Sequence, residues 1–270
     1  SSLIVFSVAS ILFSLLSGSV DISATQLAKG IFSTEHSLNA QVLQEIRIPR
    51  TLAAFVTGGL LALSGAIMQV LLRNPLADPY ILGISGGAAV GALSAILVGA
   101  TGFWLSNAAF VGALSSIFLV FGIANKFGTW SVTRLLLTGV VVSAGWGAVI
   151  NILLTTSSTN NVQSMLFWLM GDLSQSRVNP AHYLLLLGGL VGGIFISRSL
   201  NVLIRGELLA VSLGVNVNSL RLLLFFSASV FTATAVTVAG SVGFVGLIIP
   251  HILRLLGARD HRILIPSCIL

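Results

Sequence analysis

The sequence contains few charged residues for its length. Lys and Arg number 13 and Asp and Glu number 7, so that charged residues make up 7% of the 270 residues. Soluble domains carry roughly 25% charged residues, because their surface has to be hydrated. Here 56% of the residues are hydrophobic and the mean hydropathy is +1.05. We therefore exclude a soluble globular enzyme and a disordered chain.

Several chemical signatures are also missing from the sequence. The single cysteine, Cys268, lies in an apolar run, so neither an internal disulfide nor a cysteine-based metal cluster is expected. His36, His182 and His261 do not have the spacing of metal ligands. No G-x-x-x-x-G-K-[ST] motif for binding ATP occurs. The net charge is +6, but the basic residues are scattered singly, which argues against nucleic-acid binding. We expect no metal and no cofactor.

Long apolar runs predict an all-α bundle of transmembrane helices. A span needs about 20 apolar residues, which leaves room for about seven to nine spans. The runs place them near 3–17, 51–72, 80–99, 103–124, 133–155, 181–197, 221–240, 244–256 and from 263 onward. Starting from a cytoplasmic N-terminus leaves nine Lys or Arg residues inside and four outside, as the positive-inside rule requires. The polar connections 18–50 and 156–180 are then external, and 198–220 is internal.

The interiors of these spans carry no Asp, Glu, Lys or Arg. A carrier coupled to protons or sodium usually needs such a residue, so if this protein pumps a solute, the energy has to come from elsewhere. Small residues four apart, such as Gly83, Gly87 and Gly91, predict closely packed helices. The segment 64–79 is faintly echoed by 239–251, which is entered from the opposite side as in an inverted repeat.

Three short segments stand out between the spans. Arg47 and Arg50 flank Pro49 at an external span end, where they can anchor the helix or dock an acidic partner. The segment 73–79, RNPLADP, predicts a tight non-helical turn on the inner side. The internal segment 205–215 is amphipathic and suits either the lipid interface or a protein contact.

A fourth segment suggests a different class of protein. Residues 83–86, GISG, match the G-x-S-G of rhomboid-type intramembrane proteases, with Ser85 as nucleophile and His251 as a possible base. Four small residues are a common accident in a glycine-rich helix, so this hypothesis ranks well below transport.

Taken in order, these motifs resemble the FecCD-type permeases, the membrane subunits of ABC importers for ferric siderophores, haem and cobalamin. The resemblance is carried by RIPR at 47–50, RNPLADP at 73–79, WLMGDL at 168–173, LGV at 213–215 and GFVGLIIPHILR at 243–254. It implies one transmembrane permease domain over 1–270, of the ten-helix type II kind. About eight helices and the start of a ninth are expected here, with the last two missing.

The resemblance also implies roles for individual residues. Arg47 and Arg50 are similar to arginines that meet glutamates of a periplasmic binding protein. The cytoplasmic gate is expected at Asn74, Leu76, Thr129 and Ser131. Residues resembling the helix that couples to the ATPase are Arg205, Gly206, Glu207, Leu213 and Gly214.

The expected function is therefore import driven by other proteins. The resemblance implies two cytoplasmic ATPase subunits, a periplasmic substrate-binding protein, a second permease subunit (a homodimer being expected) and the lipid of the bacterial inner membrane. The chain itself is expected to have no catalytic residues. The alternatives are the intramembrane serine protease and an uncoupled channel or secondary carrier.

Overall fold

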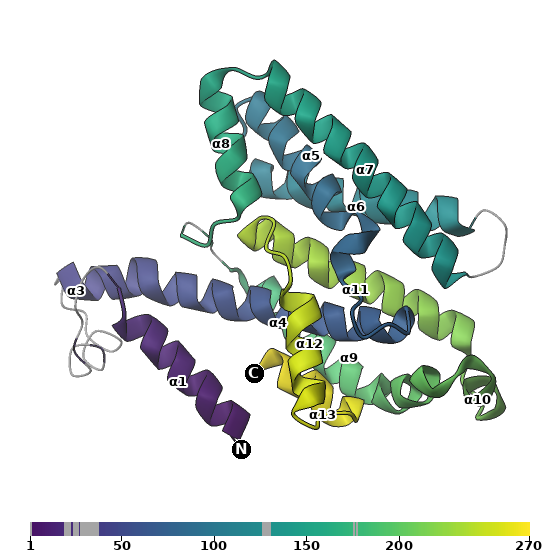
Figure 1. Ribbon diagram of the computed structural model, residues 1–270. Helices are drawn as coiled ribbons and strands as arrows, with labels where there is room; N and C mark the ends of the chain where they lie inside the picture. The colour runs from purple at the N-terminus through teal and green to yellow at the C-terminus, as the bar shows by residue number, and fades with distance from the viewer. Residues whose placement is uncertain are drawn as a thin grey trace.

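The computed structural model describes residues 2–18, 23, 27, 38–125, 131–174, 176 and 178–270. Within these ranges every regular element is a helix (Figure 1). Helices satisfy all backbone hydrogen bonds within one segment, which an apolar chain in lipid requires. The predicted all-α class is confirmed.

Five helices are long and apolar enough to cross a membrane: Asn39–Leu71, α6 (Phe103–Asn125), α7 (Val132–Thr156), α9 (Pro180–Arg205) and α11 (Val217–Ala239). The first of these joins α3 (Leu38–Gln41), the π-helical η1 (Val42–Arg47) and α4 (Ile48–Leu71). The shorter helices are α1 (Ser2–Leu16), the 3-10 helix η2 (Pro79–Leu82), α5 (Ile84–Leu97), α8 (Thr159–Met170), α10 (Glu207–Ser212), α12 (Val245–Leu255) and α13 (His261–Ile269).

Several helix ends differ from those that hydropathy predicted. The helix expected over 51–72 already begins at residue 38, because the π-helical η1 runs directly into α4. Pro49 lies in the first turn of α4, where its missing amide hydrogen is tolerated. The expected span 80–99 is divided at Gly83, which has a φ of +70°. The expected loop 156–180 contains α8, and α9 continues to Arg205 instead of ending at 197.

Helix α4 is the most deeply buried of the long helices. In its most apolar stretch 72% of the residues are buried, against 22% for α7 and for α9. Its partner α12 lies so close that a Cβ atom at Gly65 would stand 1.8 Å from the carbonyl oxygen of Gly246. On another side the Ser64 hydroxyl donates to the carbonyl of Ala228 on α11 at 2.7 Å. Small residues thus let the backbones approach closely. The predicted glycine pattern does the same on α5, where a Cβ atom at Gly87 or Gly91 would stand 2.4 or 2.1 Å from a carbonyl oxygen of α6.

The two segments that echo each other in the sequence lie against each other, since the Gln69 side chain donates to the carbonyl oxygen of Leu247 at 3.3 Å. The residues that follow the first segment continue this contact. The Tyr80 hydroxyl in η2 donates to the carbonyl oxygen of Val242 at 2.8 Å, beyond the end of α11. Near the start of α5, the Ser85 hydroxyl is 2.8 Å from that of Ser241. Interrupted helices therefore meet inside the bundle, where their free backbone groups find partners within the protein.

Candidate functional site

The candidate coupling helix α10 is a short helix that follows α9 after a single glycine. Gly206 has a φ of +137°, a backbone conformation that other residues rarely adopt, so the chain can end α9 and begin α10 at once. Ala210 is fully buried, whereas Leu208 is 88% exposed and Leu213 is 62% exposed. Helix α10 therefore presents apolar side chains outward while one side packs against the protein.

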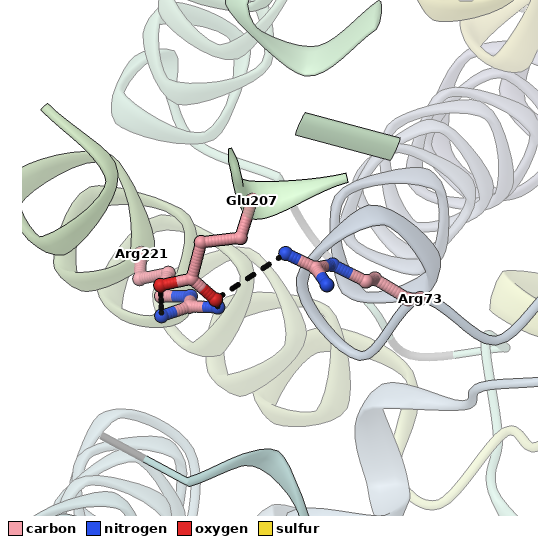
Figure 2. A network of polar contacts seen from close by, with 3 residues as sticks. All are labelled: Arg73, Glu207 and Arg221. Carbon is pink, nitrogen blue, oxygen red and sulfur yellow. Dashed lines mark hydrogen bonds and ion pairs between the residues drawn. The ribbon is translucent and has the colours of Figure 1, made fainter. Parts of the chain in front are cut away.

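Glu207, the first residue of α10, bonds to two arginines from distant parts of the chain (Figure 2). Its two carboxylate oxygens accept hydrogen bonds from the Arg221 guanidinium on α11, at 3.0 and 2.7 Å. One of these oxygens lies 3.5 Å from Arg73 Nη2, just after α4. The hydrogen bonds from Arg221 are the main reason why the pKa of Glu207 is lowered from its ordinary value, so the carboxylate stays charged at neutral pH.

Arg73 begins the segment that we call the 73–78 turn, which connects α4 to η2. The Arg73 backbone has a φ of +49°, which is uncommon for a residue other than glycine. The Asn74 side-chain oxygen accepts from the Leu76 amide at 3.0 Å, and the Asn74 amide donates to the Gln69 carbonyl at 3.1 Å. The turn is thus a closed hydrogen-bonded unit, with Leu76 56% exposed at its surface.

The other two expected gate residues, Thr129 and Ser131, precede α7 in the sequence. Thr129 falls outside the described residues. Ser131 caps α7, since its hydroxyl accepts a hydrogen bond from the Arg134 amide at 3.4 Å. The start of α7, the C-terminal end of α4 and α10 all lie at the same end of the molecule, on the right in Figure 1.

The two candidate docking arginines have different surroundings. Arg47 is only 8% exposed, and its guanidinium donates to the carbonyl oxygens of Leu15 and Leu16, at 2.8 and 3.1 Å, at the end of α1. Arg50 is exposed. Its positive charge helps to lower the pKa of Asp172, although hydrogen bonds from Ser174 are the larger cause. Arg50 therefore presents its charge outward, while Arg47 holds two helices together.

The remaining expected residues of the coupling segment are accessible. Arg205 is exposed at the end of α9, and Gly214 is exposed with a φ of +79° after α10. The roles of Arg73 and Arg221 escaped the sequence analysis. Arg73 is far from Glu207 in the sequence, and Arg221 is 14 residues from it, in the next span. No local sequence pattern marks either pair. The one available signal was that each arginine stands at the end of a span.

The geometry does not favour the protease hypothesis. The hydroxyl of Ser85 is hydrogen-bonded to that of Ser241, and α12 places His251 in the middle of a helix. In the described part of the chain, no group of three or more His, Cys, Asp or Glu side chains could hold a metal ion.

The fold and these sites together define a multi-pass helical membrane protein with an exposed amphipathic helix and a tight turn at one end. Comparison with known proteins then identifies the family. Residues 5–270 match the FecCD transport family, and the chain belongs to it.

Curated relatives support this membership. The chain is 44% identical over 229 residues to the cobalamin import system permease protein BtuC of Halobacterium salinarum, covering 83% of this chain and 62% of that protein. It is 38% identical over 230 residues to the vitamin B12 import system permease protein BtuC of Klebsiella pneumoniae, covering 84% of this chain and 69% of that protein. The chain thus spans less than two thirds of the archaeal relative.

A solved structure matches the fold. It is described as an inward-facing conformation of a proposed metal-chelate type ABC transporter, and the TM-score is 0.85 at 31% sequence identity. The match covers 99% of this chain and 84% of that chain. The likeness confirms the permease type of helical bundle.

Proposed function

We propose that this chain is the membrane permease of a binding-protein-dependent ABC importer that moves cobalamin or an iron complex, a ferric siderophore or haem, into the cytoplasm. In this proposal residues 1–270 belong to one membrane domain in the inner membrane, with the N-terminus in the cytoplasm. ATP is hydrolysed on two separate cytoplasmic subunits, and the permease has no enzymatic activity of its own. The observation that carries the proposal is α10, an apolar helix exposed beside the 73–78 turn in a member of this family.

The coupling role of α10 is supported by its exposed side chains. Leu208 and Leu213 expose apolar surface that a protein partner can bury. The segment carries little basic charge, which does not suit attachment to anionic lipid. ATP-driven closure of the ATPase subunits would displace α10, and closely packed helices would convert this displacement into opening or closing of the pathway.

Docking of the binding protein is assigned to the opposite end. Arg50 supplies an exposed guanidinium that suits a carboxylate of the partner. Arg47 belongs to the same surface in this proposal. Its guanidinium is bonded to the carbonyls at the end of α1, so its proposed part in docking is to hold the helix end that carries Arg50. Gating at the inner end is assigned to Asn74, Leu76 and the start of α7.

A second permease subunit, forming a homodimer, is supported by the exposed surface of α7. Ala144, Asn151 and Thr155 recur on one side of this helix and are exposed. Small and polar residues on a membrane helix usually face another helix or a water-filled pathway, because lipid satisfies no polar group. We place the translocation pathway between this surface and a second copy.

The proposal is tested by reconstituting the complete protein with its ATPase and binding protein in liposomes. We expect ATP-dependent uptake of one cargo among labelled cobalamin, a ferric siderophore and haem. Uptake driven by an ion gradient without the ATPase would instead establish a secondary carrier or channel.

Two matched leucine substitutions test the coupling helix. Leu213→Asp should weaken copurification of the ATPase by at least about tenfold, as expected when an apolar contact at the centre of an interface is lost. Leu256→Asp, at an exposed leucine after α12, should leave copurification unchanged. Equal behaviour of the two variants would contradict the role of α10.

A further inference from the structure

We infer that Arg73 and Glu207 form the link through which movement of α10 reaches the 73–78 turn. The inference rests on the proposed import function and adds the residues that connect the coupling helix to the gate. Glu207 is the first residue of α10, so its carboxylate moves with that helix. Arg73 is the first residue of the turn that holds Asn74 and Leu76. The ion pair between them therefore joins the start of one element to the start of the other (Figure 2).

The two arginine contacts of Glu207 differ in strength. Arg221 donates two hydrogen bonds in a bidentate geometry, and its side chain is only 8% exposed. Breaking this contact would leave a buried guanidinium without a counter-charge, which is strongly unfavourable. The Arg221 contact therefore keeps α10 attached to α11.

The contact between Arg73 and Glu207 is weak enough to break and re-form. It is a single contact of 3.5 Å, and the side chains of Arg73 and Glu207 are 36% and 44% exposed. Ion pairs exposed to this degree are weak because water competes for both charges. A shift of α10 can therefore break and re-form this contact while the Arg221 contact persists.

The backbone of Arg73 makes the turn responsive to this contact. Arg73 has a φ of +49°, and a residue other than glycine keeps this backbone conformation only where contacts with its surroundings hold it. The next residue, Asn74, closes the turn through hydrogen bonds to Leu76 and Gln69. Displacement of the Arg73 side chain therefore acts directly on the residue that starts the gate turn.

The test uses the complete transporter in liposomes and measures cargo taken up per ATP hydrolysed. Arg73→Asn removes the guanidinium, and asparagine tolerates the left-handed backbone. We expect uptake per ATP to fall about fivefold or more, in the range of couplings between distant sites. ATPase copurification and ATP hydrolysis should stay within about twofold of wild type, as for an ordinary surface substitution.

Three further variants and a matched control separate the link from a merely structural effect. Arg73→Lys keeps the charge and should restore uptake per ATP. Glu207→Gln removes the charge facing Arg73 and also the counter-charge of the buried Arg221, so it should lower uptake per ATP at least as far as Arg73→Asn and weaken ATPase copurification as well. The double variant should take up no less cargo per ATP than Glu207→Gln alone, because Glu207→Gln has already removed the contact with Arg73. Arg198→Asn, at an exposed arginine on α9, is the matched control and should behave as wild type.

The outcomes are distinguishable. Unchanged uptake per ATP in Arg73→Asn would overturn the link, as would a double variant whose defect is the product of the two single defects. Uptake and hydrolysis falling together in Arg73→Asn would also overturn it, because that pattern indicates a structural role. A wild-type complex without ATP-dependent uptake would overturn the proposed function, and the link with it.

Discussion

Arginines at the ends of the helices have different roles because their surroundings differ. The Arg47 guanidinium is buried and lies at the C-terminal carbonyls of α1, which lack partners within their own helix and carry partial negative charge. Three residues later, Arg50 is exposed. The two arginines are less than one helical turn apart, yet Arg47 contributes to stability and Arg50 is available to a partner.

Substitution of these two arginines should therefore give opposite results. Arg47→Ala removes two charge-assisted hydrogen bonds and should lower the free energy of unfolding by about 1.5–3 kcal/mol. Arg50→Ala should leave that free energy unchanged and weaken the affinity for the binding protein. Thermal unfolding in detergent and titration with the binding protein measure the two quantities. Loss of stability in Arg50→Ala with none in Arg47→Ala would contradict this assignment.

Among the elements, α4 determines how the other helices are arranged. At Gly65 the backbone of α12 lies directly against α4, and at Ser64 the side chain donates to a backbone carbonyl of α11. The Gln69 side chain donates to the Leu247 carbonyl at 3.3 Å. Weak forces between apolar helices in lipid become effective only at such close approach. The cost is that a single added methyl group at the contact cannot be accommodated.

Two glycines on α4 test this packing with the same chemical change. Gly65→Ala would place a methyl group against the backbone of Gly246 and should destabilise the protein by at least about 1–3 kcal/mol, the usual cost of overpacking. Gly58→Ala is the control, because a Cβ built there has no atom of another helix within 4 Å. Unfolding in detergent measures both, and an equal effect at the two positions would show that the α4–α12 contact is looser than described.

At the scale of the whole molecule, the burial of the long helices is uneven. Helices α4 and α11 form the interior, with 72% and 61% of their most apolar stretches buried, whereas α7 has 22%. The exposed surface of α7, like that of α9, is therefore a place where lipid, a pathway or another subunit meets the chain.

Cysteine cross-linking of the complete protein distinguishes these cases. Val141→Cys, at a side chain 70% exposed on α7, should form a cross-linked dimer if two copies face each other there. Thr138→Cys, nearly one turn earlier and 9% exposed, should not. The native Cys268 is buried and should give no background. A monomer in both variants would contradict the dimer surface proposed on α7.

Sequence alone predicted the helical class, the 73–79 turn and the short helix near 205–215, because apolar composition, proline positions and amphipathic patterns are local properties. It predicted the ends of the helices less well. Residues 38–50 are polar enough to suggest a loop, yet they continue the helix through η1, and Arg47 within them is bonded to the end of α1, a contact that hydropathy does not describe.

Composition by itself determined that this chain belongs in a membrane, since too few charges are present to hydrate its surface. Only the tertiary structure decided which arginine is buried at Leu15 and Leu16, and that Glu207 joins α10 to both Arg221 and Arg73. The physical reason is that an ion pair depends on the distance between charges in space. Helix packing sets that distance. It cannot be predicted from the type of a residue or from its neighbours in the sequence.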